Sequence, residues 1–234
     1  VETALAGVKE VTHVKVGFLP APKAQPGVPV GPGGAVRPPV RQFAPELKEG
    51  QEMLFFLAKH PSADFYVLPA MSPPVDVSTD AGKKEIDGVK KTLEVLADPM
   101  KGLKSDKADV RATTAATLVM KYRSYPDMGG EVDQVAIGAD ESKLILKAIA
   151  EGDWSNQVKP GTPANLNPSV VTAFYQIGLT DKDGWRQPMF PQPQPGQPPV
   201  DFNALVKEAF VKWLAGPGKD YQIKKMVPKK PTEK

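Results

Sequence analysis

The distribution of proline is the feature of this sequence that most constrains its fold. Of 26 prolines, eight lie in residues 20–45 and six in residues 188–199. Proline fixes φ and has no amide donor, so neither stretch can form a regular helix or a central strand. We expect two long, partly polyproline loops at residues 20–45 and 187–200 that act as spacers, with docking into a proline-binding groove as the alternative.

The residues before position 79 are rich in strand signals. Three segments carry them: 11–19 with β-branched residues, the continuous apolar run "EMLFFLA" at 52–58, and "DFYVLP" at 64–69. The last two are joined by a turn that contains Pro61 and Ser62. The run at 52–58 is expected to be a central strand, and the chain is expected to leave the sheet from residue 72 onward. Three strands are few for an independent core, so we expect further strands upstream of Val1.

The hydrophobic period becomes helical from position 79 onward. It predicts five helices, at residues 79–98, 105–123, 139–154, 167–180 and 201–218. The expected N-caps are Ser105, Asn167 and Asp201, and the expected C-terminal stops are Asp98 before Pro99, Gly152, Gly178 and Gly216 before Pro217. The apolar face of the last helix is expected to comprise Phe202, Leu205, Val206, Ala209, Phe210, Trp213 and Leu214. A short strand can follow at residues 221–227. The class is therefore α+β, with a β-rich domain at 1–78 and a helical domain at 79–234.

Two segments, and the order of segments along the chain, resemble known families. "LKEGQEMLFFL" after a long loop resembles the strand entry of netrin-like and tissue-inhibitor-like OB barrels, which implies a small antiparallel β-barrel-like domain at 1–78. "ADVRATTAATL" at 108–118 resembles the second helix of a HEAT repeat, which implies helix-on-helix packing in an all-helical domain of about five helices. The order of segments resembles a family of uncharacterised exported bacterial proteins that join such domains, which implies a signal peptide before Val1.

Composition excludes several function classes. A formal charge of +3, with acids and bases alternating along most of the chain, does not favour nucleic-acid binding. The chain has no cysteine, which excludes disulfides, thiolate metal sites and cysteine nucleophiles. No apolar run approaches the roughly 18 residues of a membrane span, so we expect no transmembrane segment.

The candidates for chemistry are few. The chain has two histidines, His13 and His60, without an HExxH pairing or a GxSxG elbow. We expect His60 to be a hairpin residue, and we expect no catalytic site, no metal and no cofactor. A metal-dependent hydrolase that uses both histidines is an alternative, because paired strands can bring them to one rim. The stretch "DKDGW" at 181–185 lacks the later ligands of a calcium loop and is predicted to be a turn.

We therefore expect a non-catalytic, exported (periplasmic or cell-envelope) binding or structural subunit. It would act through protein–protein contacts in a larger assembly or at the cell envelope. An inhibitor or regulator of an exported peptidase is an alternative that rests on the netrin-like resemblance. The candidate partner-binding residues are all aromatic: Phe43, Phe65, Tyr66, Phe190, Trp154 and Trp185. For the two tryptophans, which follow acid–glycine turns, packing against a helix end is the competing interpretation.

Overall fold

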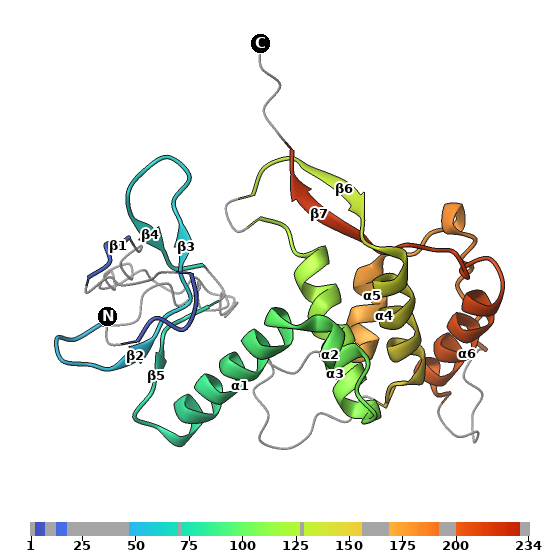
Figure 1. Cartoon of the computed structure of the whole chain (residues 1–234), viewed down its shortest axis with the longest axis horizontal. Coiled ribbons are helices and arrows are strands. Elements are labelled where there is room, and N and C mark those ends of the chain that lie inside the picture. The colour runs from blue at the N-terminus through green and yellow to red at the C-terminus, as the bar shows by residue number, and fades with distance from the viewer. Residues whose placement is uncertain are drawn as a thin grey trace, which may run out of the picture. The chain divides into compact units, whose positions relative to one another are not determined.

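A computed structural model describes residues 3–7, 13–17, 47–69, 72–126, 129–155, 169–191 and 200–229. The chain divides into two compact units, Val1–Asp87 and Gly88–Lys234. The division lies inside helix α1 (Asp80–Ala97), shown in Figure 1, a few residues after the expected boundary at 78. Helices and small sheets together confirm the predicted α+β class.

In the described part of the first unit there are five short strands: β1 (Val16–Gly17), β2 (Met53–Leu54), β3 (Ala58–Lys59), β4 (Tyr66–Val67) and β5 (Val75–Asp76). One sheet has the order β1-β4-β3, with β1 parallel and β3 antiparallel to β4. The other pairs β2 with β5 in antiparallel fashion. Over the described residues neither sheet closes, so the expected barrel-like domain is not confirmed, and the β1–β4 pair departs from an antiparallel arrangement.

The apolar run at 52–58 is not the single central strand that we expected. β2 and β3 lie within or at the end of this run, yet they belong to different sheets. Residues 72–78, expected to leave the sheet, instead supply β5, whose Val75 pairs with Leu54. A run without polar alternation does not fix which face is buried, so long-range partners decide where each strand begins and ends.

Local side-chain bonds cap the entry into α1. The Asp76 carboxylate accepts hydrogen bonds from the Ser78 amide and hydroxyl, at 2.9 and 2.6 Å, and these bonds lower the pKa of Asp76. Thr79 Oγ1 accepts from the Gly82 amide at 3.0 Å. A Cβ atom at Gly82 would lie 2.0 Å from the Asp76 carbonyl oxygen, so only glycine allows this close approach.

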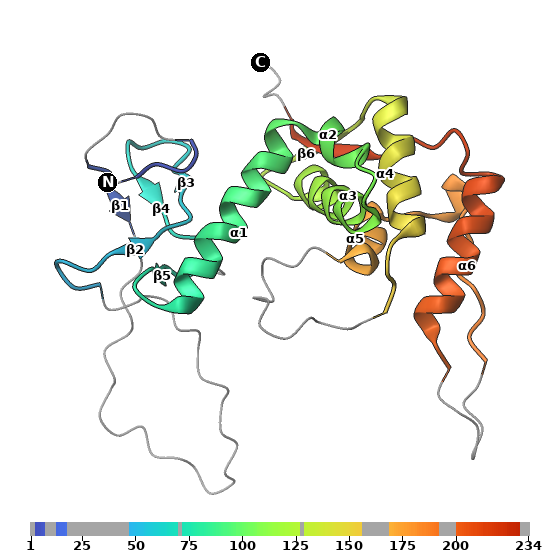
Figure 2. The ribbon, with the colours of Figure 1, turned by 60° about the horizontal axis from the view of Figure 1, so that its bottom comes forward.

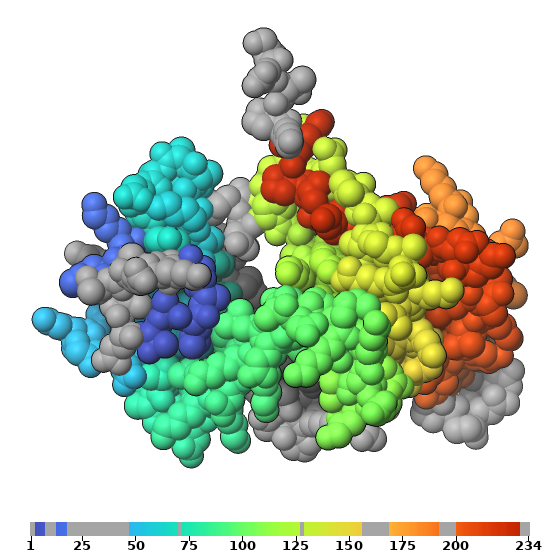
Figure 3. Space-filling view, in the orientation of Figure 1, coloured from blue at the N-terminus to red at the C-terminus, as the bar shows by residue number. Residues whose placement is uncertain are grey.

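The second unit is built around one central helix. Its helices are α2 (Pro99–Leu103), α3 (Ala108–Arg123), α4 (Ala139–Glu151), α5 (Val170–Ile177) and α6 (Phe202–Ala215). Figure 2 looks nearly along α3, which packs against α2, α4 and α5. Residues 114–119 of α3 are all buried, so this stretch of more than one turn is covered by its neighbours on every side. On the face in Figure 3, α4 (yellow) lies between the green α2–α3 region and the red α6.

Two predicted helix boundaries are confirmed by their capping bonds. The Asp201 carboxylate accepts from the Ala204 amide at 3.0 Å at the start of α6. Gly178 ends α5 with a φ of 71°, the left-handed conformation that glycine adopts without strain. Both signals lie within one turn of the helix end, so neighbouring residues alone determine them.

Other boundaries differ from the prediction. Helix α5 begins after Ser169, whose hydroxyl accepts from the Thr172 amide, whereas the expected cap Asn167 lies outside the described residues. Helix α3 begins three residues after Ser105 and has no side-chain cap. The expected stop at Asp98 is confirmed, since α1 ends at Ala97. Asp98 also accepts from the Lys101 amide and caps α2, a helix that the sequence did not predict.

The second unit is not all-helical, which corrects the expected architecture. β6 (Val132–Ala136) pairs antiparallel with β7 (Lys224–Pro228), and the Ile137 amide continues the ladder by donating to the Ile223 carbonyl at 2.9 Å. The C-terminal strand was expected, but its partner was not. The paired residues are about ninety positions apart, so neither strand carries a local signal for the other.

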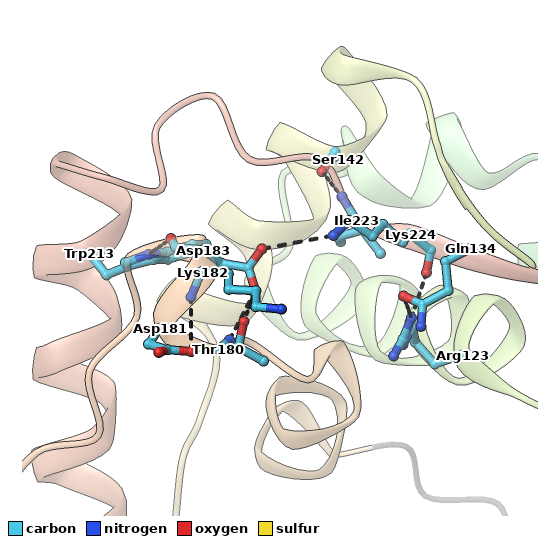
Figure 4. A network of polar contacts seen from close by, with 10 residues as sticks. All are labelled: Arg123, Gln134, Ser142, Thr180, Asp181, Lys182, Asp183, Trp213, Ile223 and Lys224. Carbon is cyan, nitrogen blue, oxygen red and sulfur yellow. Dashed lines mark hydrogen bonds and ion pairs between the residues drawn. The ribbon is translucent and has the colours of Figure 1, made fainter.

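A polar network anchors the segment that leads into β7 (Figure 4). The buried Ser142 hydroxyl accepts from the Ile223 amide at 2.9 Å. Arg123 Nη1 donates to the Lys224 carbonyl at 3.1 Å, and Lys224 Nζ lies 3.9 Å from Asp183 Oδ1. Helices α3 and α4 and the turn η2 (Asp181–Asp183) thereby hold one strand through both backbone and side chain.

Aromatic rings fill the core beside α6. The buried rings are Trp154, Phe174, Trp185, Phe210 and Trp213. Phe174 contacts Phe210 edge-on at 4.9 Å between centroids, and the Trp213 indole N–H donates to the Asp183 carbonyl at 2.9 Å. Aromatic side chains bury large apolar surfaces, so this cluster stabilises the unit. Within the described residues, no helix is both long and apolar enough to cross a membrane.

Candidate interaction surface

Two of the predicted aromatic residues and His60 come together at the β3–β4 hairpin. The His60 amide donates to the Phe65 carbonyl at 3.0 Å, and the two rings stack with centroids 4.5 Å apart and planes at 27°. The His60 Nδ1 atom accepts from the Ser62 amide at 3.3 Å. His60 therefore stabilises its own turn, as a hairpin residue is expected to do.

An ion pair closes the same hairpin on its exposed side. Lys59 Nζ lies 2.5 Å from the Asp64 carboxylate and 5.0 Å from the centre of the Tyr66 ring. The hydrogen bond between them raises the pKa of Lys59 and lowers the pKa of Asp64. Both groups are solvated, so the pair contributes little stability. The ammonium group of Lys59 also lies over the ring of the half-buried Tyr66, which is a cation–π contact.

His13 is exposed and precedes β1, at the end of the sheet where the β3–β4 hairpin turns. A zinc site needs three or four ligands that converge on one point. Across the described ranges, no group of three or more histidine, aspartate and glutamate side chains meets that requirement. Among these residues there is therefore no set of zinc ligands around His13 and His60, as a metal-dependent hydrolase would require.

Phe190 takes part in an exposed aromatic pair in the second unit. Its ring meets the ring of Phe202 edge-on, with centroids 5.0 Å apart and planes at 89°. Phe190 is 39% exposed, Phe202 46%, and the adjacent Met189 95%. We call these three residues the aromatic patch. Residues of this kind are enriched where proteins bind one another.

Phe202 was expected on the buried stripe of α6. Val206, Phe210 and Trp213 of that stripe are buried, but Phe202 is the first residue of the helix and projects beyond its packed part. Helical periodicity assigns a face and cannot show where the neighbouring elements end. The cap at Asp201 was the one signal that placed Phe202 at a helix end.

Trp154 and Trp185 lie inside the core, 4% and 7% exposed. The Trp154 indole donates to the Ile149 carbonyl at 2.9 Å at the end of α4, and both rings contact Phe174. These contacts correspond to packing against a helix end, so a partner cannot reach either ring in this conformation. Phe43, the remaining candidate, lies outside the described residues.

Comparisons of the chain with protein-family models, with curated proteins and with solved structures found no match. Functional inference therefore rests on the chemistry of the chain itself, and the aromatic patch is the surface with the clearest binding character.

Proposed function

We propose that this chain is a non-catalytic, exported binding or structural subunit that acts through contacts with another protein, in a larger assembly or at the cell envelope. The edge-on pair of Phe190 and Phe202 carries this proposal. Two phenyl rings that remain 39% and 46% exposed keep apolar surface in contact with water. Covering that surface is favourable, at roughly 25 cal/mol per Å² of apolar area.

The geometry of the pair supports a protein contact. An edge-on arrangement holds each ring in place, so little side-chain entropy remains to be lost on binding. Met189 adds a flexible side chain that adapts to an opposing surface. Anchors of this kind typically cost more than about 1 kcal/mol of binding energy when truncated to alanine.

The position of the patch in the sequence gives further support. Met189 and Phe190 stand at the start of the proline-rich stretch "PQPQPGQPP", and Phe202 follows its end. Proline-rich segments are common elements of protein recognition because little backbone entropy is lost when they bind. In the sequence, the aromatic patch therefore flanks a segment of a kind that proteins often recognise.

Site-specific crosslinking tests the proposal. A photoreactive residue at position 189 in the native host should produce one discrete adduct with another protein, which mass spectrometry identifies. Phe190→Ala combined with Phe202→Ala should abolish that adduct. The matched control places the same group at Tyr125, which is 63% exposed and lies away from the patch in the sequence. A purified protein that stays monomeric, with no adduct from position 189, contradicts the proposal.

Export and a barrel-like first unit belong to the same proposal. Two small sheets with open outer edges, within the described residues, leave strand edges available for the further ladder partners that a closed barrel requires. Nuclear Overhauser contacts that link β2 or β5 to the edges of the β1-β4-β3 sheet would establish closure. Fractionation of native cells tests export, and recovery from the cytosol alone would count against it.

A further inference from the structure

A hollow of about 330 Å³ opens on the surface of the second unit. We propose that it binds a small carboxylate with an apolar body. Its lining comes from α2, α3 and α4 and the turn after α2: Leu103, Lys104, Ser105, Arg111, Leu144, Lys147, Ala148 and Glu151. The volume lies at the lower end of the range for small-molecule pockets, roughly 300–1,000 Å³.

The floor of the hollow is apolar. Leu103 and Ala148 are 1% and 3% exposed and belong to the hydrophobic core, and Leu144 packs against that core. Because Leu103 and Ala148 are already almost fully covered, an alkyl or aryl group would mainly cover the half-buried Leu144, and it would do so without disturbing any hydrogen bond. A bare inorganic anion would gain nothing from this floor.

The rim of the hollow is cationic. Three cations, Lys104, Arg111 and Lys147, line the hollow together with one carboxylate, Glu151, which gives the lining a formal charge of +2. Glu151 lies between two of the cations, with Oε2 3.0 Å from Arg111 Nη2 and Oε1 3.7 Å from Lys147 Nζ. The remaining charge favours an anion and disfavours a cation.

Arg111 is fixed before any ligand arrives. Its Nη1 atom donates to the carbonyls of Ser105 and Asp106, at 2.9 and 3.1 Å. A guanidinium held in this way loses little side-chain entropy when it meets a carboxylate. Glu151, whose side chain is 41% exposed, acts as an internal competitor that a bound carboxylate can displace into solvent.

The experiment uses hexanoate as the probe, with the intact chain labelled for NMR. We expect saturable shifts at the methyl groups of Leu103, Leu144 and Ala148. Hexanamide has the same alkyl chain but no charge, and inorganic phosphate is charged but has no alkyl chain. Both should shift these methyls far less. Equal responses to phosphate and hexanoate, or none to hexanoate, would overturn the proposal.

Charge variants give the second arm. Lys104→Ala with Lys147→Ala should weaken hexanoate binding by about fivefold, the effect of losing exposed charge partners. Glu151→Gln should tighten binding by a similar factor because the internal competitor is neutralised. Lys212→Ala is the matched control, since Lys212 pairs with Glu208 on α6 at 2.7 Å and does not line the hollow. Unchanged affinity in both lining variants would refute the site.

Discussion

Gly218 lies against the face of Trp213, so closely that a Cβ atom at position 218 would be 2.5 Å from the indole ring. The Gly218 amide also donates to the Trp213 carbonyl at 2.8 Å. The turn after α6 therefore folds back over a core side chain, which directs the chain toward β7.

Gly218→Ala should lower the free energy of unfolding by about 1–3 kcal/mol, the usual cost of overpacking. Urea unfolding followed by tryptophan fluorescence measures this effect, since all three tryptophans lie in the second unit. Gly216→Ala is the control in the same turn, because its Cβ would lie at an ordinary 3.5 Å from the Lys212 carbonyl. Equal losses in the two variants would contradict the proposed contact.

Ser142→Ala should destabilise the second unit by about 1–3 kcal/mol because the Ile223 amide loses its acceptor in a buried place. The hydroxyl also donates to the Tyr221 carbonyl at 3.3 Å. Ser124→Ala removes an exposed bond to the Met120 carbonyl and should change stability by less than about 0.5 kcal/mol. Denaturant titration of both variants makes the comparison.

Arg123→Ala should loosen β7 more than the rest of the unit. Arg123 donates to the carbonyls of Gln176 and Lys224, so it joins α5 to the C-terminal strand. Hydrogen exchange should become faster for the amides of residues 224–228, with smaller changes in α4. Arg186→Ala, at an exposed position, should leave exchange in β7 as it is in the parent chain.

High pH should destabilise the protein through Tyr221. Burial, with the nearby negative charge of Asp183, raises the pKa of Tyr221 from 10.0 to about 12. The folded state thus favours the neutral phenol, and this contribution is complete below pH 10.0 and is lost as pH rises through about 12. In urea unfolding, Tyr221→Phe should show a shallower fall in stability across this range. Tyr125→Phe, which changes an exposed ring, should follow the parent protein.

Phe202 and Phe210 lie on the same helix and should behave differently. Phe210 is fully buried, so Phe210→Ala should cost about 3–5 kcal/mol of stability. Phe202→Ala removes a ring that is 46% exposed and should cost less than about 1.5 kcal/mol. Thermal unfolding of both variants measures the difference. A large loss for Phe202→Ala would mean that this ring serves the core rather than a surface.

The hairpin and most helices were predictable because their signals are local. Asp201 bonds to an amide three residues ahead, and Gly178 relieves strain at its own position, so the sequence alone indicates these ends. The turn at His60 likewise depends on neighbours such as Ser62 and Phe65. These features form within one or two turns of backbone, whatever the rest of the chain does.

The aromatic patch was half predictable. Phe190 follows from its place beside the proline-rich stretch, but Phe202 was assigned to the core by periodicity alone. Which residues of an apolar stripe become buried depends on the length and position of the elements opposite them. That information belongs to the packed unit and not to the helix.

By itself, the sequence determined the α+β class, the approximate helices and several of their ends, since capping bonds and helical stripes involve residues within four positions of one another. Only the tertiary structure decided that β6 pairs with β7, that the run at 52–58 is divided between two sheets, and that Trp154 and Trp185 are buried while Phe202 is exposed. Those outcomes depend on contacts between distant segments, whose energies favour one arrangement only when the whole unit has packed.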